Sequence, residues 1–190
     1  TVKLTNLQLQ LLHFNADVKR PKNVSAREKV TSLNPEVKVV TYPCRFTEEN
    51  AESIILGLKS REEVNGLLTP SPEPLGGEYD FIVDCCDNYA TKLLINDVCV
   101  KLQKPYSHGA VIALRGEVMT CIPGTACYIC VFETPPEDGV LPPSSQLGIL
   151  GSVAGIIGSI QATQAITYLV GIDGFITKRV LVISAQTMNF

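Results

Sequence analysis

The sequence lacks the features that mark several large classes of protein. Its formal net charge is −3, so basic residues are not in excess, and nothing in the charge balance indicates nucleic acid as a main partner. The first residues do not resemble a signal peptide, and the seven cysteines are odd in number and irregularly spaced, which argues against a secreted disulfide framework. We therefore expect a protein of a reducing compartment, with the cytoplasm as the default location.

The chain also contains no internal repeat and no low-complexity tract. Its 190 residues are 45% hydrophobic and 18% charged, which is typical of one globular α/β domain with a sizeable core. Residues 147–170 are apolar enough to suggest a membrane span. Polar residues interrupt this run at helical spacing, so the pattern predicts a buried amphipathic helix and no membrane span; they are Gln161, Thr163, Gln164 and Thr167.

The centre of the chain predicts a parallel crossover unit. Residues 81–83 form a short apolar run that predicts a buried strand. A helical pattern begins at Tyr89, and residues 105–111 predict a second strand. A strand, a helix and a strand in this order place the two strands side by side and parallel.

Polar side chains follow the first of these strands directly, at Asp84, Asp87 and Asn88. Ligands usually bind at this edge of an open α/β sheet, because strand ends and helix starts leave polar groups free there. Asp87 is suited to a metal ion on a nucleoside triphosphate, since hard divalent cations prefer carboxylate and phosphate oxygens. Asn88 would add a directional hydrogen bond. The alternative for Asp87 is an ordinary helix cap.

Lys22 stands at the start of another predicted helix, where free N–H groups and the helix dipole favour anions. A lysine there can neutralise a phosphate as a compact charge, although an ordinary solvated lysine is the alternative. Lys22 and Asp87 together would suit a nucleotidyl transfer, in which positioning and charge neutralisation dominate.

Apolar spacing and turn residues predict the remaining elements. They are a helix at 21–33, a strand at 37–42, a helix at 47–58, a loop at 63–77, a strand at 116–122, a Pro-rich crossing segment at 134–145, a helix from about Gly148 and a strand at 179–183. Glycines recur along the last helix at positions 148, 151, 155 and 158. Because a helical glycine costs about 1 kcal/mol relative to alanine, this spacing indicates another backbone packed closely against it, within the domain or across a dimer.

Cys127 and Cys130 form a C-x-x-C pair, which is half of a tetrahedral zinc site. The sequence contains no second pair, and a redox role is the weaker alternative because the pair follows a Pro-Gly turn. The other cysteines and the two histidines, His13 and His108, have no obvious partners nearby in sequence, so most of these residues are expected to be structural.

Five segments in this order resemble motifs of the ThiF/MoeB/HesA family, the bacterial relatives of ubiquitin-activating enzymes. They are Thr5–Gln10 for S-N-L-x-R-Q, Arg20–Lys22 for G-x-P-K, Asp84–Asn88 for D-x-x-D-N, Cys127–Cys130 for the first zinc pair, and the glycine-rich segment from Gly148 to Ile166. The resemblance covers essentially the whole chain. It implies a single domain over residues 1–190 with a Rossmann-like, mostly parallel sheet, an antiparallel C-terminal portion and flanking helices.

The resemblance also implies a function. The family binds ATP and Mg²⁺ and adenylates the C-terminal Gly-Gly carboxylate of a ubiquitin-like or sulfur-carrier protein, as in thiamine or molybdopterin biosynthesis. By this resemblance Lys22 contacts phosphates, and Asp87 supports magnesium and the adenylation step. The nucleotide site would also include Thr5, Asn6, Gln8 and Asn88, with zinc held by Cys127 and Cys130 and the protein forming a homodimer.

The chain departs from the family pattern at some positions, and other family features are expected outside the chain. The first strand, the G-x-G-G-x-G phosphate loop and the ribose-binding acid are expected before Thr1, and the second zinc pair after Phe190, so the resemblance implies a domain incomplete at both ends that binds ATP poorly alone. Leu9 stands where the family has arginine, and Ser144 stands roughly where members that form a thioester or an acyl-disulfide have a cysteine. We therefore expect adenylation without covalent capture; the alternative is a non-catalytic partner or pseudoenzyme that binds a ubiquitin-like protein. A dehydrogenase-like domain fits poorly because no dinucleotide fingerprint is present.

Overall fold

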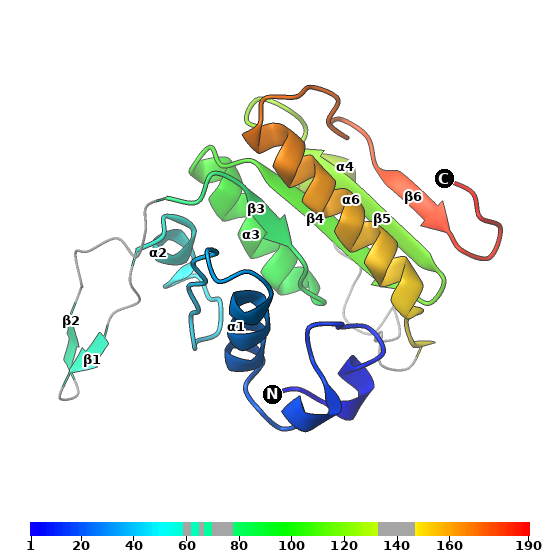
Figure 1. Ribbon diagram of the computed structural model, residues 1–190. Helices are drawn as coiled ribbons and strands as arrows, with labels where there is room; N and C mark the ends of the chain where they lie inside the picture. Colours follow the sequence, from blue (N-terminus) through cyan, green and yellow to red (C-terminus); the bar gives the residue numbers. More distant parts are fainter. Residues whose placement is uncertain (59–61, 65–66, 70–77, 133–146) are drawn as a thin grey trace. The chain divides into compact units, whose positions relative to one another are not determined.

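Figure 1 shows a computed structural model of the protein, which describes residues 1–58, 62–64, 67–69, 78–132 and 147–190. The chain divides into two compact units, Thr1–Arg45 and Phe46–Phe190. The predicted crossing segment at 134–145, which includes Ser144, lies outside the described residues.

The first unit contains two 3-10 turns, η1 (Leu4–Asn6) and η2 (Asn15–Asp17), and one helix, α1 (Lys22–Leu33). The helix confirms the prediction from Pro21 and Asn34-Pro35. The strand predicted at 37–42 is wrong, because these residues pair with no other strand among the described residues. A β-branched run becomes a strand only where a neighbouring backbone supplies hydrogen bonds, which composition alone does not reveal.

The second unit is built on a four-stranded mixed sheet in the order β3-β4-β5-β6. Its strands are β3 (Ile82–Asp84), β4 (Tyr106–Ile112), β5 (Arg115–Cys121) and β6 (Leu181–Ser184). The β3–β4 pair is parallel and joined through α3 (Tyr89–Lys101), whereas the β4–β5 and β5–β6 pairs are antiparallel. The predicted crossover unit and the antiparallel C-terminal portion are therefore confirmed.

Burial along β3 is less complete than the sequence predicts. Val83 is 43% exposed, because β3 pairs with only one neighbouring strand among the described residues and so lies at an edge of this sheet. An edge strand leaves part of its side chains accessible to water.

Two further predictions need correction in the segment before β3. The helix predicted at 47–58 is only α2 (Ala51–Ile55), because residues 47–50 form a turn and Gly57 adopts φ +68, a left-handed conformation that ends helices. The loop predicted at 63–77 begins instead with a short antiparallel hairpin of β1 (Glu62–Val64) and β2 (Leu67–Thr69). Residues 70–77 lie outside the described part of the chain.

Helices cover both faces of the four-stranded sheet, as Figure 1 shows for α3 and α6 (Gly151–Leu169). On one face, buried residues of α2 and α3 pack with Tyr106, Met119 and Cys121 of the strands. On the other face, Ile157 of α6 packs with Val118 and Ile183. Because neighbouring strand residues point to opposite faces, Val118 and Met119 belong to different cores. The result is a layered α/β fold of Rossmann-like type.

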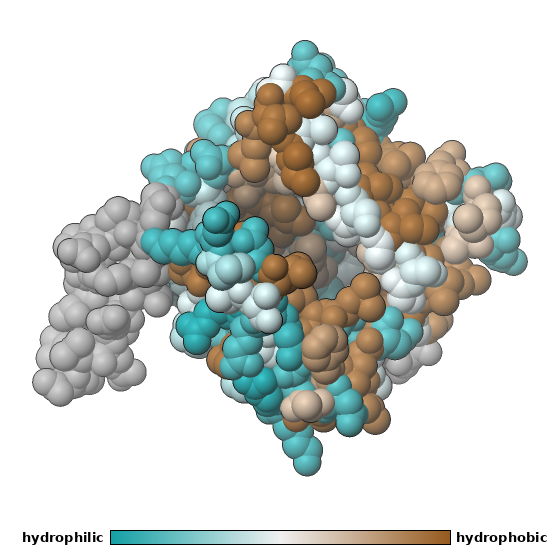
Figure 2. All heavy atoms as spheres, viewed as in Figure 1, coloured by the Kyte–Doolittle hydropathy of each residue, from teal (hydrophilic) through white to brown (hydrophobic). Residues whose placement is uncertain are grey.

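The polarity of α6 differs from the predicted amphipathic pattern. Gln161 and Gln164 lie on the buried, sheet-facing side, whereas Ile166 and Leu169 are 60% and 57% exposed. Figure 2 shows hydrophobic residues at the surface over the C-terminal part of this helix. Among the described residues, no helix is long and apolar enough to cross a membrane.

Two of the glycines of α6, Gly155 and Gly158, have no close neighbour among the described residues. A Cβ atom built on Gly155 or on Gly158 would meet nothing within 4 Å. Close backbone packing within the described part of the domain is therefore not observed, and packing across a dimer stays a prediction.

We predict that Ile157→Ala lowers the free energy of unfolding by about 2–5 kcal/mol, because Ile157 is buried between α6 and the sheet. Ile166→Ala is the matched control: it removes the same atoms from the exposed side of the same helix and should change stability by less than about 0.5 kcal/mol. Urea denaturation measures both. Equal losses would contradict this orientation of α6.

Candidate functional site

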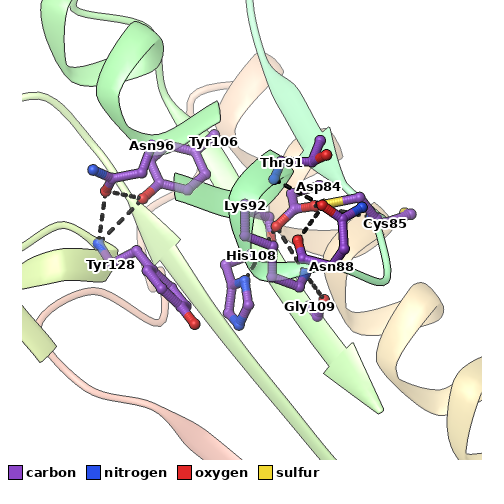
Figure 3. A network of polar contacts seen from close by, with 12 residues as sticks. Asp84, Cys85, Asn88, Thr91, Lys92, Asn96, Tyr106, His108, Gly109 and Tyr128 are labelled. Atoms are coloured by element: carbon purple, nitrogen blue, oxygen red, sulfur yellow. Dashed lines mark hydrogen bonds and ion pairs between the residues drawn. The ribbon is translucent and has the colours of Figure 1, made fainter. Parts of the chain in front are cut away.

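The carboxyl end of β3 is organised by one buried carboxylate, that of Asp84, whose residue is 2% exposed. Its Oδ1 accepts hydrogen bonds from the backbone N–H and the thiol of Cys86, at 3.0 and 2.8 Å. Its Oδ2 accepts from Lys92 Nζ at 3.0 Å and from His108 Nδ1 at 3.2 Å (Figure 3). One side chain therefore joins the end of β3, the first turn of α3 and strand β4.

Lys92 supplies the positive charge that keeps this carboxylate ionised. It is 6% exposed, and its Nζ also donates to the backbone oxygen of Gly109 at 2.8 Å. Burial alone raises the pKa of Asp84, but the hydrogen bond from His108 and the charge of Lys92 outweigh burial and hold that pKa at about 2. Two charges removed from water need such a set of partners to remain charged.

His108 faces a carboxylate on either side. Since the ionised Asp84 carboxylate only accepts hydrogen bonds, Nδ1 carries a proton. Nε2 is buried, has no hydrogen-bond partner among the described residues, and lies 3.6 Å from Glu117 Oε1. A structural role was expected for His108, but its partners were missed; the parallel register that sets Asp84 opposite His108 is the signal that identifies them.

Asp87 and Asn88 have separate roles in the Asp84–Asn88 segment. Asn88 caps α3, since its Oδ1 accepts a hydrogen bond from the backbone N–H of Thr91 at 2.9 Å. The capping alternative considered for Asp87 is therefore wrong: Asn88 occupies the cap position. The Asp87 carboxylate is exposed and has no hydrogen bond or ion pair with the described residues, so it is available to a ligand.

The remaining nucleotide-site candidates belong to the first unit. Lys22 is exposed at the first position of α1, and Thr5 and Gln8 are exposed near η1. Asn6 accepts a hydrogen bond from the backbone N–H of Lys3 at 3.0 Å, which fixes the η1 turn. A shared site for Lys22 and Asp87 stays a prediction.

The first unit also contains an ion-pair network that the sequence did not indicate. Asp17, 1% exposed, accepts hydrogen bonds from the backbone N–H of Phe14 at 2.8 Å and from Arg20 at 2.7 Å. Lys29 lies 3.3 Å from the same carboxylate. The Phe14 hydrogen bond, helped by these cations, lowers the pKa of Asp17 to about 2 despite the opposing effect of burial. This network holds the segment before α1 in place.

The two cysteines of the C-x-x-C pair are close enough for one metal ion. Their Sγ atoms lie 3.5 Å apart, and two sulfurs bound tetrahedrally at about 2.3 Å from zinc would lie about 3.8 Å apart. Hydrogen bonds from the backbone and the thiol of Cys127 lower the pKa of the Cys130 thiol, which favours the thiolate that binds metal. No group of three or more potential ligands occurs among the described residues, so the pair fits half of a site.

Helix α3 positions this pair as well. Asn96, one turn after Lys92, accepts hydrogen bonds through Oδ1 from the Tyr106 hydroxyl at 2.7 Å and from the Tyr128 backbone N–H at 3.0 Å. Tyr128 begins α4 (Tyr128–Phe132), directly after Cys127. Figure 3 shows both polar clusters along the same helix.

The chain is similar in sequence to a family and to several curated proteins. A family model described as "ThiF family" matches residues 1–190. The chain is 33% identical to the SAMP-activating enzyme E1 of Haloferax volcanii, covering 100% of the chain and 62% of the relative. It is also 33% identical to the sulfur carrier protein adenylyltransferase of Thermus thermophilus (100% and 64%) and to adenylyltransferase and sulfurtransferase MOCS3 of Culex quinquefasciatus (100% and 39%). The chain thus spans less than two thirds of these relatives.

Solved structures share the fold at low sequence identity. A crystal structure of E. coli MccB with ATP superposes with a TM-score of 0.74 at 16% identity, over 100% of the chain and 52% of that protein. A structure of MccB in complex with N-formylated MccA gives a TM-score of 0.75, also at 16% identity, over 99% of the chain and 53% of that protein. These likenesses support the Rossmann-like fold assignment.

We predict that Lys92→Met lowers the free energy of unfolding by about 3–5 kcal/mol, because it leaves the buried Asp84 carboxylate without its main cation. Lys101→Met, on the same helix, removes an exposed ion pair with Glu52 and should cost less than about 1 kcal/mol. Chemical denaturation at neutral pH distinguishes the two. A loss for Lys92→Met as small as that of the control would mean that Lys92 is not needed to hold Asp84.

Proposed function

Because the chain belongs to the ThiF family, we propose that it forms part of an enzyme that adenylates the C-terminal Gly-Gly carboxylate of a ubiquitin-like or sulfur-carrier protein. Relatives named as a sulfur carrier protein adenylyltransferase and a SAMP-activating enzyme support this proposal. The carrier protein would act in thiamine or molybdopterin biosynthesis, and the proposed location of the enzyme is the cytoplasm.

The observation that carries the proposal is the Asp84–Asn88 segment. Its two flanks are held by the Asp84 network and by the Asn88 cap, while the Asp87 carboxylate between them is exposed. Magnesium in nucleotide sites is held by one or two carboxylates together with phosphates and waters. A single exposed carboxylate on a segment held at both flanks, directly after a strand of a parallel pair, fits this requirement.

The chemistry requires positioning and charge neutralisation. A carboxylate oxygen of the carrier attacks the α-phosphorus of ATP, the bond to the bridging oxygen breaks, and pyrophosphate leaves with that electron pair. The product is an acyl-adenylate, a better electrophile than the carboxylate. Magnesium, when bound, supplies positive charge to the phosphates. Asp87 would hold that ion, and Lys22 would contact the phosphates. We assign the remaining nucleotide contacts to Thr5, Asn6, Gln8 and Asn88.

Two further features belong to this proposal. Cys127 and Cys130 would contribute half of a structural zinc site, supported by the separation of their sulfur atoms. A homodimer is supported by Gly155 and Gly158 of α6, where an added Cβ atom would meet nothing within 4 Å among the described residues. The partner is a protein with a thin, flexible Gly-Gly tail, for which an extended groove suffices.

One observation favours a second function. Leu9 stands where the family resemblance implies an arginine that meets the phosphates. A protein lacking that cation would serve as a non-catalytic subunit that binds a ubiquitin-like protein and leaves adenylation to another chain.

ATP–pyrophosphate exchange by the full-length protein, with a Gly-Gly-ended carrier, tests the proposal. We expect exchange that requires the carrier and falls by about 10²-fold or more in Asp87→Ala, because a charge-positioning group at the phosphates is lost. Asp80→Ala, an exposed carboxylate before β3, is the matched control and should retain wild-type exchange. Carrier binding without exchange in the wild-type protein would instead support the non-catalytic function.

We expect full-length protein to contain one zinc ion per chain and the Cys127→Ser, Cys130→Ser double variant to lose it. Elemental analysis of purified protein measures the ratio, and Cys44→Ser serves as the control for an exposed cysteine outside the pair. Wild-type protein without zinc would rule out the metal site.

A further inference from the structure

Helix α6 turns two amide side chains toward the sheet. Its buried positions are Val153, Ile157, Gln161 and Gln164, and the two glutamines are only 2% and 7% exposed. A buried amide must satisfy its hydrogen bonds within the protein, since the cost of leaving them unmade exceeds the gain from a typical apolar contact. Both glutamines therefore connect α6 to specific backbone or side-chain groups.

Gln161 joins the last residue of β3 to the second residue of the parallel strand β4. Its Nε2 donates to the backbone oxygen of Asp84 at 2.9 Å and to that of Ser107 at 3.1 Å. Its Oε1 accepts from the Cys85 thiol at 3.8 Å. These contacts fall on the last residue of β3, the residue that follows it, and the neighbouring strand β4.

The space for this amide is created by Gly109. A Cβ atom at Gly109 would lie 2.5 Å from Cδ and from Oε1 of Gln161, too close for either to remain in place. The backbone oxygen of Gly109 accepts from Lys92, which also holds the Asp84 carboxylate. Two helices therefore bind Asp84: Gln161 of α6 donates to its backbone oxygen, and Lys92 of α3 donates to its carboxylate.

The contacts continue to Asp87. Asp84 fixes the backbone N–H of Cys86, the residue before Asp87, and Asn88 after it caps α3. From these contacts the geometry points to Gln161 as a positioning residue that sets the backbone of the Asp84–Asn88 segment and thereby the Asp87 carboxylate. The role of Asp87 rests on the proposed function, whereas the effect on the segment does not.

Gln164 provides a matched comparison on the same helix. It is also a buried glutamine, and its Oε1 accepts from the Thr120 hydroxyl at 3.0 Å and from the Ile176 backbone N–H at 2.7 Å. Both partners lie away from β3, and Gln164 makes no hydrogen bond to residues 84–88. Replacing either glutamine with methionine removes a buried amide of similar size, so the two variants differ mainly in which segment loses its partner.

The first test is hydrogen exchange of backbone amides in the full-length protein, which needs no activity. We expect the Cys86 amide, which donates to the Asp84 carboxylate, to exchange about tenfold faster or more in Gln161→Met, while Gln164→Met leaves it as in the wild type. Gly109→Ala, which displaces the intact Gln161 amide, should reproduce the Gln161→Met pattern and serves if that variant does not fold. Equal protection of the Cys86 amide in all variants would overturn the inference.

The second test is the kinetics of ATP–pyrophosphate exchange. In Gln161→Met we expect kcat to fall about 10- to 100-fold and half-saturation to require more Mg²⁺, with the KM for the carrier unchanged. Gln164→Met should keep wild-type kinetics at a similar loss of stability. Equal kinetic losses in both variants would indicate general destabilisation and contradict a positioning role. Wild-type protein without exchange would reject the proposed function, and the amide measurement would still decide the role of Gln161.

Discussion

The ionised carboxylate of Asp84, buried against Lys92, is the interaction on which the candidate site depends. A charge in the interior is stable only when it is paired and hydrogen-bonded, and the Asp84 carboxylate has three partners, on the segment after β3, on α3 and on β4. The same contacts tie the end of β3 to α3 and β4. An exposed carboxylate on a segment with fixed neighbours is better placed to bind a metal–phosphate complex than one on a loop without such contacts.

The fold supplies these partners through register and layering. Parallel pairing sets Asp84 opposite His108, and the crossover helix returns Lys92 to the same point. On the opposite face, α6 reaches the end of β3 through Gln161. Two helices from separate layers thus meet at one residue. A change in α6 would be transmitted to the Asp84–Asn88 segment through a hydrogen bond, and α6 is also the helix with the proposed dimer face.

Local pattern predicted the parts of this arrangement that depend on neighbours in sequence. The strand–helix–strand unit around Asp84, the antiparallel strand ending at Cys121 and the long helix follow from apolar periodicity, and all were confirmed. The assignment of exposed and capping roles was harder: Asp87 and Asn88 are both good caps, and only the observed geometry assigns the cap to Asn88.

The contacts that join distant segments could not be predicted from pattern. The Lys92 and Gln161 contacts to Asp84 depend on which helix face meets which strand end, and the amides of Gln161 and Gln164 suggested a polar surface although they are buried. The strand predicted at 37–42 shows the same limit, since it has a suitable composition but no pairing partner among the described residues.

The most direct test of the proposed site is a crystal structure of the full-length protein with ATP and Mg²⁺, in which the distance from the Asp87 carboxylate to the metal is measured. We expect the carboxylate to contact the ion directly, at about 2.1 Å, or through one coordinated water. A nucleotide bound away from the Asp84–Asn88 segment would contradict the proposal.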